Sequence, residues 1–225
     1  MEPLAPQTPD PRPVDRLAAL RRSYVLGTLD PADVDPDPVA QLRRWLDDAQ
    51  DAGLVEPNAM VLATVDADGA PAARTVLCKG IDERGLVFYT QVRSAKGRQL
   101  AVHPEAAAVF VWHAMDRQAI VRGAVTPVSR AEVAAYFASR PRGSQLAAWA
   151  SDQSAVVASR AELEADYAAA ERRFAGEDVP MPEHWTGYRL ALGTVELWQG
   201  RRDRLHDRVR YRPLGHGWVV ERLAP

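Results

Sequence analysis

The feature of this sequence that most restricts its fold is a change of hydrophobic period that begins at Ala59. From there, short apolar runs alternate with turns rich in Asp and Gly; the runs read AMVLATVD, PAARTVLCKGI, LVFYT, AAAVFVWH and QAIVRGAVTP. Such runs are typical of strands, and turns of this composition join neighbours in an antiparallel meander. Because strands and helices do not alternate as βαβ units, the sequence predicts an α+β fold with helices outside an antiparallel sheet or barrel.

Helix signals precede and interrupt these strands. Asp37 is a suitable cap, Pro38 suits the first helical position, and Gly53 follows the end of an apolar face. Ser129 and Ser159 each open an S-x-x-E capping box. The sequence therefore predicts helices over residues 14–24, 94–103, 129–139 and 159–176 and from Pro38 to before Gly53, and closing strands over residues 188–198, 205–213 and 218–223.

Charge and composition exclude several classes of protein. The 225 residues carry 28 Lys and Arg against 30 Asp and Glu, so no basic field is available for nucleic acid. The single cysteine, Cys78, forms no internal disulfide, and its spacing from the histidines gives no metal site. No apolar run approaches the ~20 residues of a membrane span, and the start, MEPLAPQTPDPRP, is unlike a signal peptide. We expect a cytoplasmic protein with a disordered tail over residues 1–13 and one domain over residues 14–225.

One stretch near the C-terminus, VELWQGRRDRLHDR, carries many cations although the net charge is -2. If residues 205–213 form a strand, Arg204, His206 and Arg208 project from one face, because side chains alternate along a strand. Two full charges about 7 Å apart repel by about 2 kcal/mol at an effective dielectric near 20. This cationic row therefore indicates either a bound anion or a solvated face.

Three other groups of residues suit an anion. Arg74 and Lys79 are an odd number of residues apart, so they serve one ligand only if a bulge or a strand end redirects one of them. Ser94 and Lys96 flank a predicted helix start, where free N–H groups bind phosphate. The third group, Tyr136, Arg140 and Ser144, has hydroxyls and a guanidinium that would form a phosphate clamp.

Each feature also has a plainer interpretation when taken alone. The cations are then solvated, Arg140 is a surface residue at a helix end, Trp198 is a core tryptophan and His206 is an ordinary strand histidine.

In combination, these motifs resemble the pyridoxamine 5'-phosphate oxidase family from about Leu20 onward. The motifs, in order, are RTVLCK, FYT with a following S-x-K, YFASRPRGSQ, WASDQS, the stretch VELWQGRRDRLHDR and the terminal ERLAP. The resemblance implies a split β-barrel homodimer that binds FMN at the subunit interface. It also implies oxidation of pyridoxamine or pyridoxine 5'-phosphate to pyridoxal 5'-phosphate, with oxygen as acceptor and hydrogen peroxide as product.

The same resemblance assigns residues by position. It implies that Arg204 and His206 flank the substrate ring as catalytic residues, and that Arg21 and Tyr24 belong to a segment that closes over the site. The substrate phosphate would contact Lys79, Tyr136, Arg140 and Ser144. The FMN site would comprise Arg74, Thr75, Val76, Leu77, Cys78, Lys79, Tyr89, Thr90, Lys96, Gln118, Gln153, Ser154, Trp198 and Arg208.

The chain departs from the family at one position and leaves two other functions open. Ala95 stands where the family often has an arginine, which removes one expected contact to the FMN phosphate; Arg93 is a candidate replacement. One rival is a related flavin oxidase of phenazine-type substrates, which would lack the phosphate clamp. The other is a non-catalytic protein that binds flavin or pyridoxal phosphate, which would not need Arg204 and His206.

Overall fold

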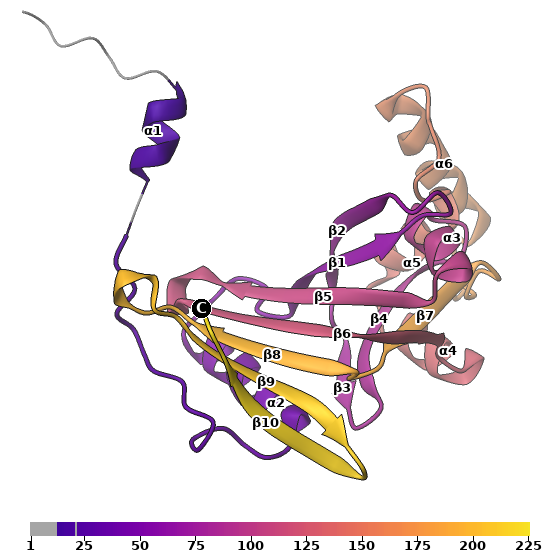
Figure 1. The fold of residues 1–225 in the computed structure, drawn as a ribbon. Coiled ribbons are helices and arrows are strands. Elements are labelled where there is room, and N and C mark those ends of the chain that lie inside the picture. The colour runs from indigo at the N-terminus through magenta and orange to yellow at the C-terminus, as the bar shows by residue number, and fades with distance from the viewer. Residues whose placement is uncertain (1–12, 21) are drawn as a thin grey trace, which may run out of the picture.

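The computed structural model describes residues 13–20 and 22–225 (Figure 1). Within these residues, ten antiparallel strands form one hydrogen-bonded sheet, in which seven strands follow the order β10-β9-β8-β6-β5-β1-β2. The other three strands join through β7, which pairs with β4 and β6, while β3 pairs with β4. The strands are β1 (Ala59–Val65), β2 (Pro71–Leu77), β3 (Gly80–Asp82), β4 (Gly85–Gln91), β5 (Glu105–Trp112), β6 (Arg117–Pro127), β7 (Trp185–Leu190), β8 (Thr194–Gln199), β9 (Asp207–Leu214) and β10 (Gly217–Leu223).

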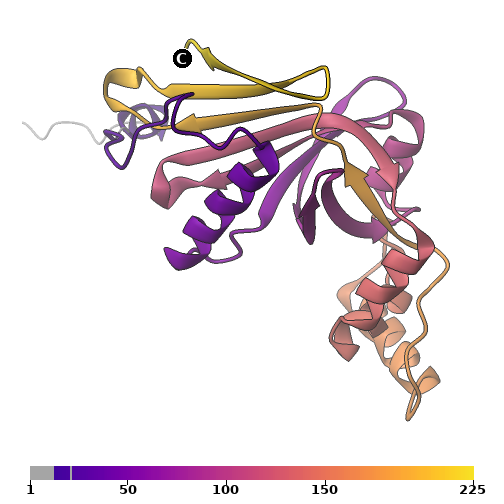
Figure 2. The ribbon, with the colours of Figure 1, turned by 90° about the horizontal axis from the view of Figure 1, so that it is seen from below.

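Strand β6 connects the two parts of this sheet. Its residues 117–122 pair with β8, whereas residues 125–127 pair with β7. Between the two ladders lies Gly123, where a Cβ atom would stand 2.3 Å from the carbonyl oxygen of Ala191. Figure 2 shows the resulting curl, which gives the sheet the shape of a half-barrel. The predicted α+β split barrel with peripheral helices is confirmed.

The helix α2 covers the core face of the larger part of the sheet (Figure 2). It begins at Pro38 because the carboxylate of Asp37 accepts a hydrogen bond from the N–H of Val39, as the capping pattern predicts. Trp45 packs edge-on against Trp112, with 6.0 Å between ring centroids. The helices are α1 (Pro13–Ala19), α2 (Pro38–Asp51), α3 (Ala95–Val102), α4 (Arg130–Ala138), α5 (Arg142–Ala150) and α6 (Arg160–Arg173), with short 3-10 turns η1 (His113–Met115) and η2 (Arg202–Arg204).

Helices α4, α5 and α6 gather at one end of the sheet around a second apolar cluster (Figures 1 and 2). The serine half of both predicted capping boxes is present, because the hydroxyls of Ser129 and Ser159 accept the N–H groups three residues later. The glutamates bind other partners: Glu132 accepts from Arg189, and Glu162 accepts the N–H of Ala158. The sequence predicts no helix at α5, and Ser144 is expected in a turn-prone segment. That expectation is wrong: α5 forms because Leu146 is buried in the second cluster beside Phe137.

The closing strands differ from their expected limits in two places. Residues 188–198 do not form one strand, because the chain breaks between β7 and β8 where Ala191 donates to the carbonyl of Ala124. The strand expected over residues 205–213 begins only at Asp207, so His206 lies outside it. A helix expected over residues 14–24 ends at Ala19.

Residues 1–12, which include almost all of the expected disordered tail, lie outside the described part of the chain. The division into a tail and a single domain stays a prediction. No helix within residues 13–20 and 22–225 is long and apolar enough to cross a bilayer.

The first turn of α3 gives a test of the packing that positions Lys96. Gly97 is buried, and a Cβ atom there would stand 2.4 Å from the Val92 oxygen and 2.6 Å from the Gln91 oxygen. We predict that Gly97→Ala lowers the free energy of unfolding by about 1–3 kcal/mol, the usual cost of overpacking. Urea denaturation measures this change. Gly217→Ala is the control, because no atom lies within 4 Å of its Cβ position; equal effects of the two variants would contradict the prediction.

Candidate functional site

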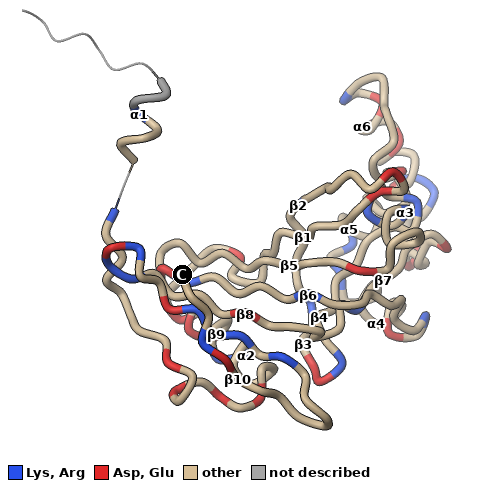
Figure 3. Tube along the Cα trace, in the orientation of Figure 1, with Lys and Arg blue, Asp and Glu red and all other residues tan. Residues whose placement is uncertain are grey.

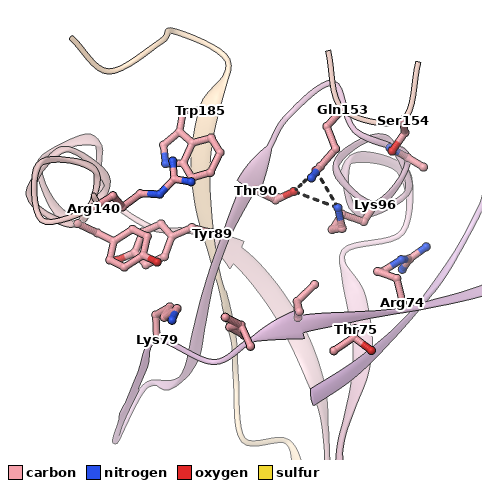
Figure 4. Close-up of a pocket in the computed structure, with 14 residues that line it drawn as sticks. Arg74, Thr75, Lys79, Tyr89, Thr90, Lys96, Arg140, Gln153, Ser154 and Trp185 are labelled. Atoms are coloured by element: carbon pink, nitrogen blue, oxygen red, sulfur yellow. Dashed lines mark hydrogen bonds between the residues drawn. The ribbon is translucent and has the colours of Figure 1, made fainter. Parts of the chain in front are cut away.

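A cavity of about 490 Å³ opens where β2 meets β4 and α3 (Figure 4). Cavities of ~300–1,000 Å³ are usual for small ligands and cofactors. The strands β2 and β4 come from different parts of the sheet, so the cavity lies at the split in the barrel. Its lining comprises Arg74, Thr75, Val76, Leu77, Lys79, Tyr89, Thr90, Ala95, Lys96, Tyr136, Arg140, Gln153, Ser154 and Trp185.

The cavity is lined by cations without acidic partners. Among the described residues, no carboxylate forms an ion pair with any of the cations Arg74, Lys79, Lys96 and Arg140. Figure 4 shows them in two groups on opposite sides, Lys79 with Arg140 and Arg74 with Lys96. Unpaired cations in a partly buried cavity favour an anionic ligand.

Several cations outside the cavity pair with carboxylates. Arg208 contacts Glu196 at 2.8 Å, and Arg210 contacts Glu221 at 2.6 Å. Figure 3 shows positive and negative segments side by side on β8, β9 and β10, where these pairs form.

Lys96 is the most deeply buried cation of the cavity, with 8% of its surface exposed. Its ammonium donates to Thr90 Oγ1 at 3.1 Å and to Gln153 Oε1 at 2.9 Å. Burial, with the nearby charge of Arg74, lowers the pKa of Lys96 to about 8. A bound anion would favour the charged form of this side chain and restore its pKa.

Arg74 reaches the same side of the cavity from β2. Its guanidinium donates to Thr64 Oγ1 at 2.5 Å and to Gln99 Oε1 at 2.9 Å, and burial lowers its pKa. Lys79 lies beyond the last residue of β2, Leu77, so the alternation of the strand no longer governs its direction. The strand end thus brings Arg74 and Lys79 to one cavity, which is one of the two ways that the sequence left open.

Aromatic rings hold Arg140 on the opposite side. Its guanidinium lies 4.3 Å from the centroid of Trp185, and Tyr136 stacks on Tyr89 at 3.8 Å. Burial lowers the pKa of Arg140 and raises that of Tyr136. The Nη1 atom of Arg140 is buried without a hydrogen-bond partner. Because a buried N–H group without an acceptor is costly, this atom is suited to a ligand oxygen.

Cys78 and Ser144 are assigned to the site but do not line the cavity. Cys78 is 5% exposed and faces the apolar core, where its thiol donates to the oxygen of Gly80 and burial raises its pKa to about 11. Ser144 lies in the first turn of α5 and is not among the lining residues.

A second group of assigned residues, here called the ring cluster, consists of Tyr24, Trp198 and His206. Tyr24 packs edge-on against both other rings, at 5.7 Å and 5.5 Å, and Trp198 lies 4.6 Å from His206. Arg204 and His206 line a cavity of about 410 Å³ beside this cluster. Burial and the charge of Arg204 lower the pKa of His206, which favours a neutral ring. Arg21 lies outside the described residues.

Gln118 and Arg208 join this second group through the sheet. Trp198 is opposite Gln118 on β6 and opposite Arg208 on β9, so the three residues form a row across neighbouring strands. Arg208 is not a free cation, because its guanidinium binds Glu196 and the oxygen of Ala224.

The cationic row expected for Arg204, His206 and Arg208 is therefore wrong. Arg204 lies in the turn η2 with a left-handed backbone (φ 61°), and only Arg208 belongs to β9. The turn closes because Arg201 pairs with Asp207 and donates its backbone N–H to His206.

The cavity and the ring cluster lie far apart within one chain. Figure 1 shows the turn between β8 and β9 at one end of the sheet and α3, α4 and α5 at the other. No sequence motif identified Trp185, which holds Arg140, or Glu196, which neutralises Arg208. Neither residue carries a local signal, because each contacts its arginine only through the folded sheet.

Solved structures with this fold include two informative cases. PhzG from Burkholderia lata, solved in complex with tetrahydrophenazine-1-carboxylic acid, has a TM-score of 0.84 and 31% identity, over 91% of this chain and 100% of that chain. A pyridoxamine 5'-phosphate oxidase-related, FMN binding protein from Nostoc punctiforme has a TM-score of 0.66 and 21% identity, over 86% and 99% of the two chains. The second likeness shows the fold alone.

Sequence comparisons give a more specific result. A family model described as Pyridoxamine 5'-phosphate oxidase matches residues 46–173, and a model of the Pyridoxine 5'-phosphate oxidase C-terminal dimerisation region matches residues 185–225. Pyridoxine/pyridoxamine 5'-phosphate oxidases from Nocardioides sp. and Thermosynechococcus vestitus are both 55% identical to this chain, over 93% of it and 98% and 99% of their own lengths. Similarity of this extent, on the same fold, shows that the chain belongs to the pyridoxamine 5'-phosphate oxidase family of enzymes.

Proposed function

We propose that this protein is an FMN-dependent oxidase that converts pyridoxamine 5'-phosphate or pyridoxine 5'-phosphate to pyridoxal 5'-phosphate. The observation that carries the proposal is the presence of two separate groups of unpaired cations in one cavity. FMN and the substrate each bring a phosphate of charge about -1.5 to -2, so two anion sites are needed. Oxygen is the proposed acceptor and hydrogen peroxide the proposed second product. The proposed location is the cytoplasm, where a lone cysteine stays reduced.

The side of the cavity that holds Arg74 and Lys96 fits the FMN phosphate. The N-terminus of α3 lies beside these cations, and Ala95, at its first residue, lines the cavity. Helix N-termini attract phosphate through free N–H groups and the helix dipole. Arg93 is exposed and is not among the residues that line the cavity in one chain, so we do not propose it as the replacement for the arginine that the family often has at position 95. FMN affinity would then depend mainly on Arg74 and Lys96.

The opposite side of the cavity fits the substrate phosphate. Lys79 and Arg140 supply charge, and the Tyr136 hydroxyl supplies a hydrogen bond. Because Arg140 is held against Trp185 and has an N–H group without a hydrogen-bond partner, it is preorganised to donate a hydrogen bond to a phosphate oxygen. These contacts hold a part of the substrate that does not react.

A homodimer would unite the cavity with the ring cluster. The match to a C-terminal dimerisation region supports a dimer, and the outer face of β1 and β5 exposes the apolar residues Val61 and Val111. We propose that this face meets a second copy. The ring cluster of one subunit would then complete the cavity of the other, with Gln118, Trp198 and Arg208 toward FMN.

In this arrangement the protein supplies orientation and charge. When bound, FMN supplies a ring that accepts a hydride from the exocyclic carbon of the substrate. Arg204 and His206 would flank the substrate ring and hold that carbon in line, while Arg140 and Lys79 anchor the phosphate. Holding the reacting groups in one geometry removes much of the entropic barrier of a bimolecular step. No nucleophilic side chain is required.

The likeness to PhzG makes a phenazine-type substrate the second candidate. The cations around Arg140 favour the phosphorylated substrate, because a phenazine carboxylic acid carries no phosphate. The deciding experiment mixes the purified protein with FMN and with each substrate, and follows aldehyde formation and oxygen consumption. Binding without turnover would instead indicate a non-catalytic carrier.

Lys96 gives a test of the FMN site. Its pKa of about 8 means that the ammonium of the free protein loses its charge as the pH rises through that value. We predict that FMN affinity of the wild-type protein weakens between about pH 7 and pH 9.5. Lys96→Met should lower FMN affinity about tenfold or more at pH 7, the effect of one charge-assisted hydrogen bond, and should flatten the pH dependence.

Fluorescence titration of FMN measures both effects. Arg98→Met is the matched control, because Arg98 is an exposed cation of the same helix that does not line the cavity. An unchanged pH dependence in Lys96→Met would remove Lys96 from the FMN site.

Arg140 tests the substrate side. We predict that Arg140→Ala raises KM for pyridoxamine 5'-phosphate about tenfold or more and leaves FMN content unchanged, because its contact is to a group that does not react. Steady-state kinetics and flavin absorbance measure the two quantities. Arg160→Ala, an exposed cation on α6, is the control. Loss of flavin with an unaltered KM would show that the assignment is wrong.

A mixed dimer tests the shared site. We predict that Lys96→Met and His206→Asn homodimers are both impaired, while co-expression in equal amounts restores activity. If each site takes Lys96 from one subunit and His206 from the other, half of the dimers are mixed and each has one intact site, which gives roughly a quarter of wild-type activity. No recovery in the purified mixed dimer would show that both residues act within one subunit.

A further inference from the structure

We propose that Asp207 is a positioning residue, whose carboxylate holds the turn over residues 200–206 so that His206 presents a protonated Nε2 to its cavity. The inference rests on the proposed function, because it assigns Asp207 a role that acts through His206. Asp207 itself does not line that cavity.

The carboxylate of Asp207 joins three separate segments. Its Oδ2 accepts the backbone N–H of Leu29 at 3.1 Å and the guanidinium of Arg201 at 2.8 Å, and its Oδ1 accepts from Arg222 at 2.9 Å. The side chain is 16% exposed. These contacts connect the N-terminal segment, the turn after β8 and the last strand, β10. One largely buried acidic group therefore fixes where β9 begins.

Arg201 transmits this constraint to the histidine. Its side chain binds Asp207, and its backbone N–H donates to Nδ1 of His206 at 3.1 Å. Because Nδ1 accepts this hydrogen bond, it carries no proton, and the proton of the neutral ring is on Nε2. The ring thus has one tautomer, with its N–H donor directed away from the turn.

The strap, residues 22–30, closes the arrangement from the N-terminal side. Arg22 forms an ion pair with the buried Asp116, and the Tyr24 ring packs against His206 and over Gly200, where a Cβ atom would stand 2.7 Å from the ring. Leu29, near its other end, is bound to Asp207. The strap and the Asp207 contacts together leave the imidazole little freedom to rotate.

Charge explains why a carboxylate is required. Arg201, Arg202 and Arg204 crowd the turn, with Asp203 as the only acidic residue between them. Asp207 forms ion pairs with Arg201, just before η2, and with Arg222, on β10. Without that charge, the arginines would repel one another and the turn would lose its anchor.

The test compares Asp207→Asn with the wild-type protein, both as full-length FMN-loaded protein. Proton–nitrogen correlation spectra of protein with labelled histidine report which ring nitrogen carries the proton, and His206→Gln identifies the signal. We expect one tautomer, protonated at Nε2, in the wild type and exchange between both tautomers in Asp207→Asn. We also expect kcat to fall about tenfold to a hundredfold, with KM and FMN content nearly unchanged, because misplacement of an orienting group affects the reacting geometry.

Asp30→Asn is the matched control. Asp30 binds the same Arg222 at 2.7 Å, but it has no contact with Arg201 among the described residues. The same change of charge there should leave the His206 spectrum and kcat as in the wild type. If loss of the Arg222 ion pair merely makes the strap more mobile, the His206 spectrum and kcat should change in both Asp207→Asn and Asp30→Asn.

A second variant covers the case in which Asp207→Asn does not fold. Arg201→Gln removes the anchoring side chain, which is 39% exposed, and keeps the backbone N–H. Arg201→Gln should also give exchange between the His206 tautomers and a lower kcat, but both effects should be smaller than in Asp207→Asn. A single wild-type tautomer and an unchanged kcat in the folded variant would overturn the proposal. If the wild-type protein oxidises no phosphorylated vitamer, the proposed function fails. The His206 spectra of the wild type and of Asp207→Asn then still test whether Asp207 positions the ring.

Discussion

The bend of β6 at Gly123 is the constraint on which the rest of this molecule depends. One strand must pair with β8 along its first half and with β7 at its end, and only a residue without a Cβ lets the chain at Ala191 pass so closely. The bend turns β4 toward β2, although the two strands share no ladder in the described structure. The cavity lies between them, so its existence follows from the split in the sheet.

The buried cations of that cavity destabilise the folded protein but favour the binding of an anion. Burying Lys96 without a carboxylate lowers its pKa by desolvation, and Arg140 keeps a buried N–H group without an acceptor. Elsewhere in the described chain, buried charge is paired, as in Arg189 with Asp82 and Glu132. A site whose cations have no acidic partners is preorganised for anions. An anion that binds only the folded protein would therefore raise the free energy of unfolding.

Local signals predicted local structure well. The helix after Asp37 and the helices after Ser129 and Ser159 begin where their caps indicate, because a cap acts within one turn. The break between β7 and β8 and the helix α5 were missed, since both arise from packing between segments distant in sequence.

In the candidate site, too, some expectations from the sequence agree with the structure and others do not. Most residues assigned to the FMN and phosphate sites by motif do line one cavity, and their roles there stay predictions. The expected row of Arg204, His206 and Arg208 failed because it assumed a regular strand. Alternation predicts direction only while backbone pairing continues, and the ladder between β8 and β9 ends at Asp207.

The buried position of Cys78 affects how readily its thiol is oxidised. Peroxide attacks the thiolate form of cysteine and drives it toward sulfenic and sulfinic acids. With a pKa of about 11, only about one Cys78 side chain in ten thousand is deprotonated near pH 7, and the sulfur faces the core rather than the cavity. Peroxide is the proposed second product, and an exposed thiolate beside the cavity would be open to this oxidation. Burial and the raised pKa together leave Cys78 a poor target for such an oxidant.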